Sequence, residues 1–593
     1  MKPNDGKRKM DESDDDFISG TPQDKRSKKM HRKKRTKSSC DFIETLEPEE
    51  KSSSVKDDVL EQNVNELFDG IDFLDDFNCD FGDVQVKCDQ TDGKGNLDLS
   101  VWKRCVVTSV ERLGSEVLLL VREENTTNEA KCLLQGAWIN SNVDINDIVS
   151  LIAEWSEKNR CFCVNDQSGF IVTSPDYLVS GTSVVGSLFC RRKGVLAERF
   201  SGIDCNNKIM AIGSIVHEIF QITLKRQLSK LDDVMSICEE MLRSHQMVYM
   251  LYETQMSVDE VRAEMKKFAH RIVEFVARYV TQMEKTFEKS SFNGTIDRID
   301  DIEENIWIPR LGLKGKVDVS VRVKKKNVLT SMPLEIKTGK SSFSLEHKGQ
   351  VMLYQMMMSE MGGEPIDSGL LLYLREGVMK EVNINRHEKR GLIMLRNEVA
   401  SYGARSELTD RIKKNMEISA EEREIFVAPD LPEPINHPSA CSKCAYNSLC
   451  CSFLSRDESL VSHPLKQLHQ QISTLTSSHI DYFIKWNGLL ALEEEQLSNE
   501  NQIKNMWLRA PEIRAANGQS VINLMVVDDV VEVEDHYLHN FQQKSSSEQV
   551  GDLTFTGITP GEYLRVSSSN RIAIAAGRVV SINKNTITMS LER

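Results

Sequence analysis

The sequence has 593 residues, of which 40% are hydrophobic and 28% charged, and its formal net charge is -15. This length predicts several domains, because single cores rarely exceed about 250–300 residues. The charged start and the lack of a long apolar run argue against a secretory signal and a membrane span. In such a chain, fourteen cysteines favour thiols or metal ligands over disulfides. The negative total excludes a uniformly basic nucleic-acid-binding protein, so charge has to be considered segment by segment.

Residues 1–96 are predicted to be a disordered tail with two charge blocks. Residues 25–37 carry nine Lys or Arg and no acid, which is typical of a nuclear localisation signal, although a solvated tail without that role is the alternative. Residues 41–96 carry 17 acidic and 4 basic side chains, a net of -13. Apolar residues lie among these acids: Leu67, Phe68, Ile71, Phe73, Leu74, Phe77 and Phe81. We expect this acidic segment to dock on a partner such as a single-strand-binding protein or, equally, to pack on the chain's own next domain.

Residues 97–180 predict a small β-rich module. The five expected strands are Leu99–Val110, Glu116–Arg122, Ala130–Trp138, Ile148–Trp155 and Arg160–Val172, separated by Gly, Asn and Asp. Five short strands indicate a small barrel, OB-like in type, a fold often used to bind single strands. Plain structural packing is the simpler role for any one residue here.

Residues 181–455 form the next predicted region and begin with helices. The stretch 209–224 has apolar residues at helical spacing, and Gly213, His217 and Gln221 form a neighbouring stripe four residues apart. A lone histidine beside an apolar stripe is more often a satisfied core residue than a ligand. Residues 222–290 continue with helical periodicity and are expected to be a helical insertion.

Residues 312–340 predict two paired strands joined by a basic turn. Aliphatic residues occupy alternate positions: Val317, Val319, Val321, Val323, Leu334 and Ile336. Side chains alternate between the two faces of a strand, so Asp318, Glu335 and Lys337 share the polar face. Two carboxylates and a lysine at the edge of a buried sheet suit Mg²⁺ or Mn²⁺, with the lysine near the metal-bound water. A solvated sheet face is the simpler alternative.

A helix is expected directly after these strands, in the sequence HKGQVMLYQMMM. His347, Gln350 and Tyr354 fall on one stripe of it, at i, i+3 and i+7. Gln350 and Tyr354 facing the paired strands could hold a scissile phosphate or orient Lys337. An ordinary packed helix is the alternative.

The cysteines form a second pattern. Cys441, Cys444 and Cys450 have the spacing C-x2-C-x5-C, one thiolate short of a zinc site or a cubane cluster. Cys190, ahead of the paired strands, is the natural fourth ligand, with Cys205 as a substitute for it and Cys451 as a substitute for Cys450. Spacing alone does not separate zinc from iron–sulfur, and unligated thiols are the third alternative.

These motifs together resemble the RecB-like PD-(D/E)xK nucleases, in their iron–sulfur branch. The phrases IWIPRLGLKGKVDVSV, PLEIKTGK and HKGQVMLYQ look closer still to the nuclease half of the eukaryotic DNA replication ATP-dependent helicase/nucleases. The resemblance implies an α/β core with a central mixed sheet flanked by helices. The resemblance implies that Mg²⁺ or Mn²⁺ is held by His217, Asp318, Glu335 and the Ile336 carbonyl. It implies that cleavage is assisted by Lys337, Gln350 and Tyr354. It also implies that a 4Fe–4S cluster is held by Cys190, Cys441, Cys444 and Cys450.

The remaining residues predict a helical stalk over 456–512 and a second small β-barrel over 513–593. The strand-like segments there include VINLMVV, DLTFTGI, EYLRVSS, RIAIAAGRVVSI and TITMSL. The phosphate loop G-x-x-x-x-G-K-[ST], which the family's helicase half needs, does not occur in the sequence. We therefore expect a chain without its own motor, as a truncated isoform, a fragment or a divergent paralogue.

The resulting prediction is a metal-dependent nuclease acting on single-stranded DNA ends or 5′ flaps, in replication and in resection of broken ends. We expect it in the nucleus, with the mitochondrion as a second compartment, and not at a membrane. Two rivals stay open at this point. One is a non-catalytic protein that binds single-stranded DNA or regulates partners, and the other is a zinc-stapled structural module.

Overall fold

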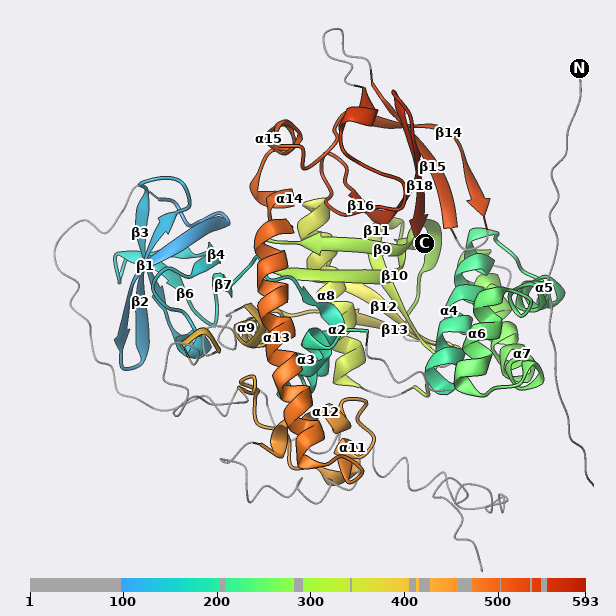
Figure 1. Ribbon diagram of the computed structural model, residues 1–593, viewed down its shortest axis with the longest axis horizontal. Coiled ribbons are helices and arrows are strands. Elements are labelled where there is room, and N and C mark those ends of the chain that lie inside the picture. The colour runs from blue at the N-terminus through green and yellow to red at the C-terminus, as the bar shows by residue number, and fades with distance from the viewer. Residues whose placement is uncertain are drawn as a thin grey trace, which may run out of the picture. The chain divides into compact units, whose positions relative to one another are not determined.

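The computed structural model describes residues 97–202, 208–281, 292–341, 344–404, 412–414, 427–456, 472–501, 503–533, 536–544 and 552–592 (Figure 1). The predictions for the tail 1–96, with its basic run and its acidic segment, lie outside these residues. So does Cys205.

A seven-stranded sheet forms first, in the order β5-β6-β3-β2-β1-β4-β7. Its strands are β1 (Lys103–Leu113), β2 (Glu116–Glu123), β3 (Glu129–Leu134), β4 (Ile148–Ile152), β5 (Glu154–Ser156), β6 (Cys161–Val164) and β7 (Phe170–Thr173). Neighbours are antiparallel except β3 and β6, which are parallel. Only Ala153 separates β4, which pairs with β1, from β5, which pairs with β6. The stretch Ile148–Ser156 therefore contributes the edge strand β5 at one end of the strand order and β4, next to the edge strand β7, at the other end.

The predicted strand limits in this module are wrong at three places. The expected strand Ala130–Trp138 ends at Leu134, because Gly136 has a φ of 60° and the chain turns into a 3₁₀-helix, Gly136–Asn140. The expected strand Arg160–Val172 divides into β6 and β7, since Gly169, with a φ of 77°, follows a turn there. The expected strand Ile148–Trp155 divides at Ala153 into β4 and β5.

A second, mixed sheet is formed by strands between Val179 and Asn383. Its order is β13-β12-β11-β10-β8, and β9 also pairs with β10. The strands are β8 (Val179–Ser180), β9 (Thr295–Ile308), β10 (Leu313–Lys325), β11 (Val328–Lys337), β12 (Ser368–Tyr373) and β13 (Val378–Asn383). β10 and β11 are the antiparallel pair expected from residues 312–340, whereas β11 and β12 run parallel. This mixed sheet with flanking helices confirms the α/β prediction.

Helices cover this sheet because its strands are apolar at alternate positions. Val319, Val321 and Val323 are fully buried in one cluster with Phe220 and Phe275. Fully burying each such side chain contributes about 1.5–3 kcal/mol. Figure 1 shows α8 (Leu345–Gly362) lying along the sheet, and it packs on β11 and β12. The shorter helices α2 (Gly181–Gly186) and α3 (Arg191–Arg199) and the long α9 (Arg386–Ala404) pack nearby.

Helices also occupy the stretch where the sequence predicts an insertion. They are α5 (Leu231–Met241), α6 (His245–Thr254) and α7 (Val258–Phe275), followed by a π-helical turn, Val276–Val280. The helix expected around His217 precedes them as α4 (Lys208–Lys225). Ser257 begins α7 with a reciprocal capping box to Glu260, which satisfies two free backbone donors. These helices bury an apolar core that is continuous with the valines of β10.

The C-terminal part contains α11 (Pro438–Cys441), α12 (Asn447–Leu454), α13 (Ser477–Asn501), α14 (Asn505–Leu508) and α15 (Pro511–Ala516). A sheet follows in the order β14-β15-β18-β17-β16. Its strands are β14 (Leu524–Val533), β15 (His536–Gln543), β16 (Tyr563–Val566), β17 (Ala575–Ile582) and β18 (Thr586–Glu592). The segment DLTFTGI, expected to be extended, instead forms a 3₁₀-helix, Leu553–Phe555, because Asp552 accepts the N–H of Thr554 and begins a turn.

Candidate active site

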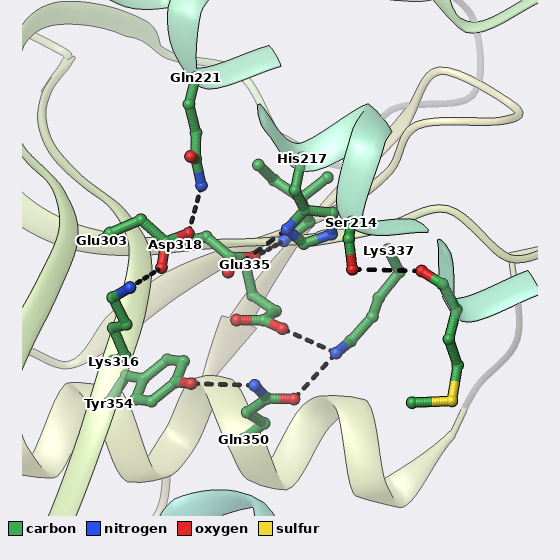
Figure 2. Close-up of polar contacts among 12 residues, drawn as sticks. Ser214, His217, Gln221, Glu303, Lys316, Asp318, Glu335, Lys337, Gln350 and Tyr354 are labelled. Atoms are coloured by element: carbon green, nitrogen blue, oxygen red, sulfur yellow. Dashed lines mark hydrogen bonds and ion pairs between the residues drawn. The ribbon is translucent and has the colours of Figure 1, made fainter. Parts of the chain in front are cut away.

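Asp318, Glu335 and Lys337 converge where β10 and β11 meet (Figure 2). The backbone N–H of Ile336 donates to Asp318 Oδ2 at 2.8 Å. The Lys337 ammonium donates to Glu335 Oε1 at 2.7 Å. Glu335 is only 2% exposed. The alternative of a solvated sheet face is therefore wrong for this part of the pair.

Helix α8 extends this network from the other side, as the sequence predicts. Lys337 Nζ donates to Gln350 Oε1 at 2.9 Å, and Gln350 Nε2 donates to the Tyr354 hydroxyl at 2.9 Å. Gln350 and Tyr354 lie one helical turn apart, so both reach the end of β11. His347, on the same stripe, lies instead 3.1 Å from the Tyr373 hydroxyl through its Nδ1.

His217 approaches the carboxylates from α4. Its Nδ1 lies 3.6 Å from Asp318 Oδ1. Burial lowers the pKa of His217, but the hydrogen bond and the negative charge of Asp318 outweigh burial, so the pKa stands above its usual value. The histidine is thus oriented toward a carboxylate of the site and is not a core residue satisfied elsewhere.

Glu335 is electrostatically the most perturbed group of the site. Burial, and then the negative charge of Asp318, raise its pKa from 4.5 to about 8, although Lys337 acts in the opposite direction. Its Oε2 is buried and has no hydrogen-bond partner among the residues that the structure describes. An unpaired buried acceptor costs free energy unless a cation or donor reaches it.

A second ion pair borders the catalytic cluster and was not predicted. Lys316 Nζ lies 2.7 Å from Glu303 Oε2, and the amide of Gln221 donates to the other Glu303 oxygen (Figure 2). Glu303 has a φ of 57°, a left-handed conformation that a glutamate rarely adopts. The neighbouring Glu304 is buried and accepts a hydrogen bond from the Ser320 hydroxyl. Side-chain alternation in the sequence does not show which of these two adjacent glutamates faces the candidate active site.

The oxygen donors at this site fit a hard divalent cation. Glu335 Oε2 is free to bind one, and a cation there would remove the repulsion between Glu335 and Asp318. His217 would supply a nitrogen donor beside them. Within the described ranges, no three His, Cys, Asp or Glu side chains are already close enough to form a complete metal site. Binding would therefore need small side-chain movements.

The predicted cysteine ligands all line one small cavity, although among the described residues they too are not close enough to form a complete metal site. Cys190, immediately before α3, lines one small cavity together with Cys441, Cys444 and Cys450. The four thiols are half-buried, and burial raises the pKa of Cys450 to about 12. More than 250 residues of chain separate Cys190 from the other three, so only the tertiary fold could show that they meet.

The alternative ligand Cys451 lines the same cavity but is more buried than the other four cysteines. It is 3% exposed and donates from its sulfur to Asn447 Oδ1 at 3.0 Å. Arg192, itself 2% exposed, lies near Cys450 and Cys451, and its Nε is buried without a partner among the described residues. A buried cation beside these thiols would offset the negative charge that the site gains when the thiols deprotonate to bind a metal or a cluster.

Comparisons with known proteins agree with this geometry. A family model described as DNA replication factor Dna2 matches residues 123–323, which include His217 and Asp318. The DNA replication ATP-dependent helicase/nuclease DNA2 of Gallus gallus is 32% identical over 498 residues, which are 78% of this chain and 49% of that protein. This chain is related to the DNA2 helicase/nucleases. The DNA2 protein of Homo sapiens is 30% identical over 503 residues, 80% of this chain and 46% of its own length.

More distant DNA2 relatives match the same share of the chain. The protein of Schizosaccharomyces pombe is 26% identical over 468 residues, 77% of this chain and 31% of its own. The chain spans about half the length of the vertebrate DNA2 proteins that it matches, consistent with their nuclease half. None of the helices that the structure describes is long and apolar enough to cross a membrane.

Proposed function

We propose that this chain is a metal-dependent nuclease that cleaves single-stranded DNA ends or 5′ flaps. The flaps would arise during Okazaki-fragment maturation, and the ends during resection of double-strand breaks. Relationship to the DNA2 helicase/nucleases supports the reaction class and the replication context. The arrangement of Asp318, Glu335 and Lys337 supports phosphodiester hydrolysis as the chemistry.

The observation that carries this proposal is the buried, unpartnered Oε2 of Glu335 beside Asp318. These carboxylates and His217 would hold Mg²⁺ or Mn²⁺, with the Ile336 carbonyl as a further oxygen donor. The bound ion would lower the pKa of a water molecule and offset negative charge at phosphorus. Asp318 is already fixed for this role by the N–H of Ile336.

Lys337 is placed to act on the attacking water. Its ammonium is shared between Glu335 and Gln350, at 2.7 and 2.9 Å, so its position is set from two sides. From there it can orient the water and stabilise the hydroxide that attacks. Gln350 is in turn held by Tyr354, and these two side chains can contact the scissile phosphate.

We also propose that Cys190, Cys441, Cys444 and Cys450 hold a 4Fe–4S cluster. Their convergence and the buried Arg192 support it, because a thiolate-ligated cluster is anionic. The cluster would join segments about 250 residues apart and stabilise the nuclease region by restricting the unfolded chain. The hydrogen-bonded, buried Cys451 fits this ligand set less well.

For the seven-stranded module we propose an OB-like barrel. Its support is the parallel pairing of β3 with β6 and the near continuity of β4 and β5. For residues 513–593 a second small barrel stays a prediction. Outside the described residues, we propose that run 25–37 directs the chain to the nucleus, with the mitochondrion as a second compartment. We propose that segment 41–96 contacts a single-strand-binding protein such as replication protein A.

The deciding experiment is Mg²⁺-dependent cleavage of a labelled flap DNA without ATP, comparing wild type, Glu335→Ala and Glu335→Gln. We expect cleavage by the wild type and loss by both variants. Glu381→Gln is the matched control, since Glu381 is a carboxylate of the same sheet paired with Lys325, away from the site. If the wild type binds single-stranded DNA but does not cut in Mg²⁺ or Mn²⁺, the nuclease proposal is wrong.

A further inference from the structure

A cavity separate from the carboxylates of the candidate active site lies at the junction of several segments. Its volume is about 440 Å³, within the usual range for small-ligand pockets. It is lined by the start of β1, by Ser150 of β4 and Pro175 after β7, and by the end of β9 with the turn that follows it. The end of α8, helix α14 and the loop 570–572 complete the lining. Three of its lining residues, Arg310, Leu508 and Asn570, are exposed, so the cavity is open to solvent.

Three of the chain's six tryptophans line this cavity, each from a different segment: Trp102, Trp307 and Trp507. All three are only partly buried. Trp102 stacks on Phe170 with ring centroids 6.4 Å apart, and the Trp507 indole N–H donates to Asp176 at 2.9 Å. Trp102 and Trp507 are therefore held in place by the protein, and the Arg565 guanidinium lies over the Trp307 ring, 5.7 Å from its centroid. Part of the surface of each ring stays accessible.

The charges around these rings are mostly positive. Lys103, Arg104, Arg310 and Arg571 line the cavity against a single lining carboxylate, Glu360. All four cations are held by carboxylates: Lys103 by Glu123 at 2.7 Å, Arg104 by Asp176 and Glu124, Arg310 by Glu360 at 2.9 Å, and Arg571 by Glu304 at 2.9 Å. The cationic groups are thus preorganised.

Flat aromatic rings among fixed cations are the chemistry that recognises unpaired nucleobases and their phosphates. We propose that this cavity is a base-stacking subsite that anchors single-stranded DNA, with Trp307 as its central ring. The proposal rests on the proposed nuclease function and assigns its substrate a second point of attachment. A paired duplex would not fit, because its bases are stacked on each other and hidden from the indoles.

Strand β9 connects the subsite to the candidate active site. Asn305, which lines the cavity, pairs with Lys316 on β10, and Lys316 contacts Glu303 beside the catalytic carboxylates (Figure 2). Trp307 is four residues from Glu303, about 13 Å along a strand at ~3.3 Å per residue. A single strand stacked on Trp307 would therefore have a phosphate within a few nucleotides of Asp318.

The test measures DNA binding apart from cleavage. The full chain in EDTA is titrated into a fluorescein-labelled oligothymidylate, and anisotropy gives the Kd for wild type, Trp307→Ala and Trp307→Phe. We expect Trp307→Ala to raise the Kd about tenfold, because base–aromatic stacking has that size, and Trp307→Phe to restore most of the affinity. Trp486→Ala is the matched control: Trp486 is 46% exposed on α13, outside this cavity.

A second probe separates stacking from charge. An abasic oligomer of equal length keeps the phosphates but has no bases, so Trp307→Ala should leave its binding unchanged. Equal Kd values for Trp307→Ala, Trp486→Ala and wild type on oligothymidylate would overturn the subsite. A peptide with the sequence of residues 64–81, from the acidic segment 41–96, is the second ligand to test. If this peptide binds in a Trp307-dependent way and the oligonucleotide does not, the cavity is not a DNA subsite. Because no metal is present, this result is independent of whether Glu335 supports cleavage.

Discussion

The ammonium of Lys337 lies 2.7 Å from Oε1 of Glu335, and the two residues are two positions apart on the same face of strand β11. One cation thus neutralises part of a carboxylate that is 2% exposed, while the other carboxylate oxygen stays unpaired. This pair links the proposed metal ligand to the group that would orient the attacking water. The predictions below follow from it and from the cysteine site.

Replacing Lys337 by Met should abolish most of the cleavage while single-stranded DNA still binds. The side chain keeps its length but loses the ammonium that positions the water, and such groups contribute about 10²–10⁴-fold. Single-turnover cleavage at saturating Mg²⁺ measures the loss. Lys325→Met is the control, because Lys325 pairs with Glu381 in the same sheet outside the site. Equal losses in the two variants would assign the effect to stability of the sheet.

Tyr354→Phe should slow cleavage by up to about tenfold. It removes the hydroxyl that accepts from Gln350 Nε2, and a buried hydrogen bond contributes about 0.5–1.5 kcal/mol net. The weakened restraint on Gln350 should also loosen Lys337. Rates for Tyr354→Phe, Gln350→Leu and the double variant form a cycle. If the two substitutions add independently, the chain Tyr354–Gln350–Lys337 does not act as a unit.

Metal dependence should vary with pH because the pKa of Glu335 is raised to about 8. Below that pH the carboxyl carries a proton in the metal-free protein, and a divalent cation has to displace it. The Mg²⁺ concentration for half-maximal cleavage should fall by about tenfold per pH unit from pH ~6 to ~8 and then level off. The raised pKa of His217 acts in the same direction. A half-maximal concentration independent of pH would contradict this.

The same shift predicts how stability varies with pH. The folded-state pKa of Glu335 lies above the ordinary value of 4.5, so between these values the folded protein binds more protons than the unfolded chain. Its contribution is present below pH 4.5 and is lost as pH rises toward 8. Thermal unfolding in EDTA should show this decline for wild type, and Glu335→Gln should remove it.

Cys190→Ser should remove bound iron, and Cys451→Ser should not. The first substitution deletes one of the four proposed ligands, whereas Cys451, which lines the same cavity, is buried and its sulfur donates to Asn447. We expect about four irons per wild-type chain with a brown colour, and neither in Cys190→Ser. Colourless protein with stoichiometric zinc would instead identify a structural zinc site, since d¹⁰ zinc does not absorb visible light.

Much of the site was readable from the sequence because its chemistry is local. Glu335 and Lys337 are two residues apart on one strand, and Gln350 and Tyr354 are one turn apart on one helix. The valines of β10 and the helix period of α8 depend on side-chain alternation alone. The same local rules misjudged DLTFTGI and missed β15 (His536–Gln543), which is largely polar and depends on its neighbours β14 and β18 for pairing.

Contacts between residues that are distant in the sequence were determined only by the tertiary structure. The sequence alone determined which side chains could bind a metal, a cluster or DNA, since these abilities belong to the residue types and their short spacing. The fold decided that Cys190 and Cys441 line one cavity, that Glu303 and Lys316 border the candidate active site and that Trp102, Trp307 and Trp507 share another cavity. The physical reason is that these contacts depend on the pairing of separate strands and on the packing of helices between them, which no local pattern specifies.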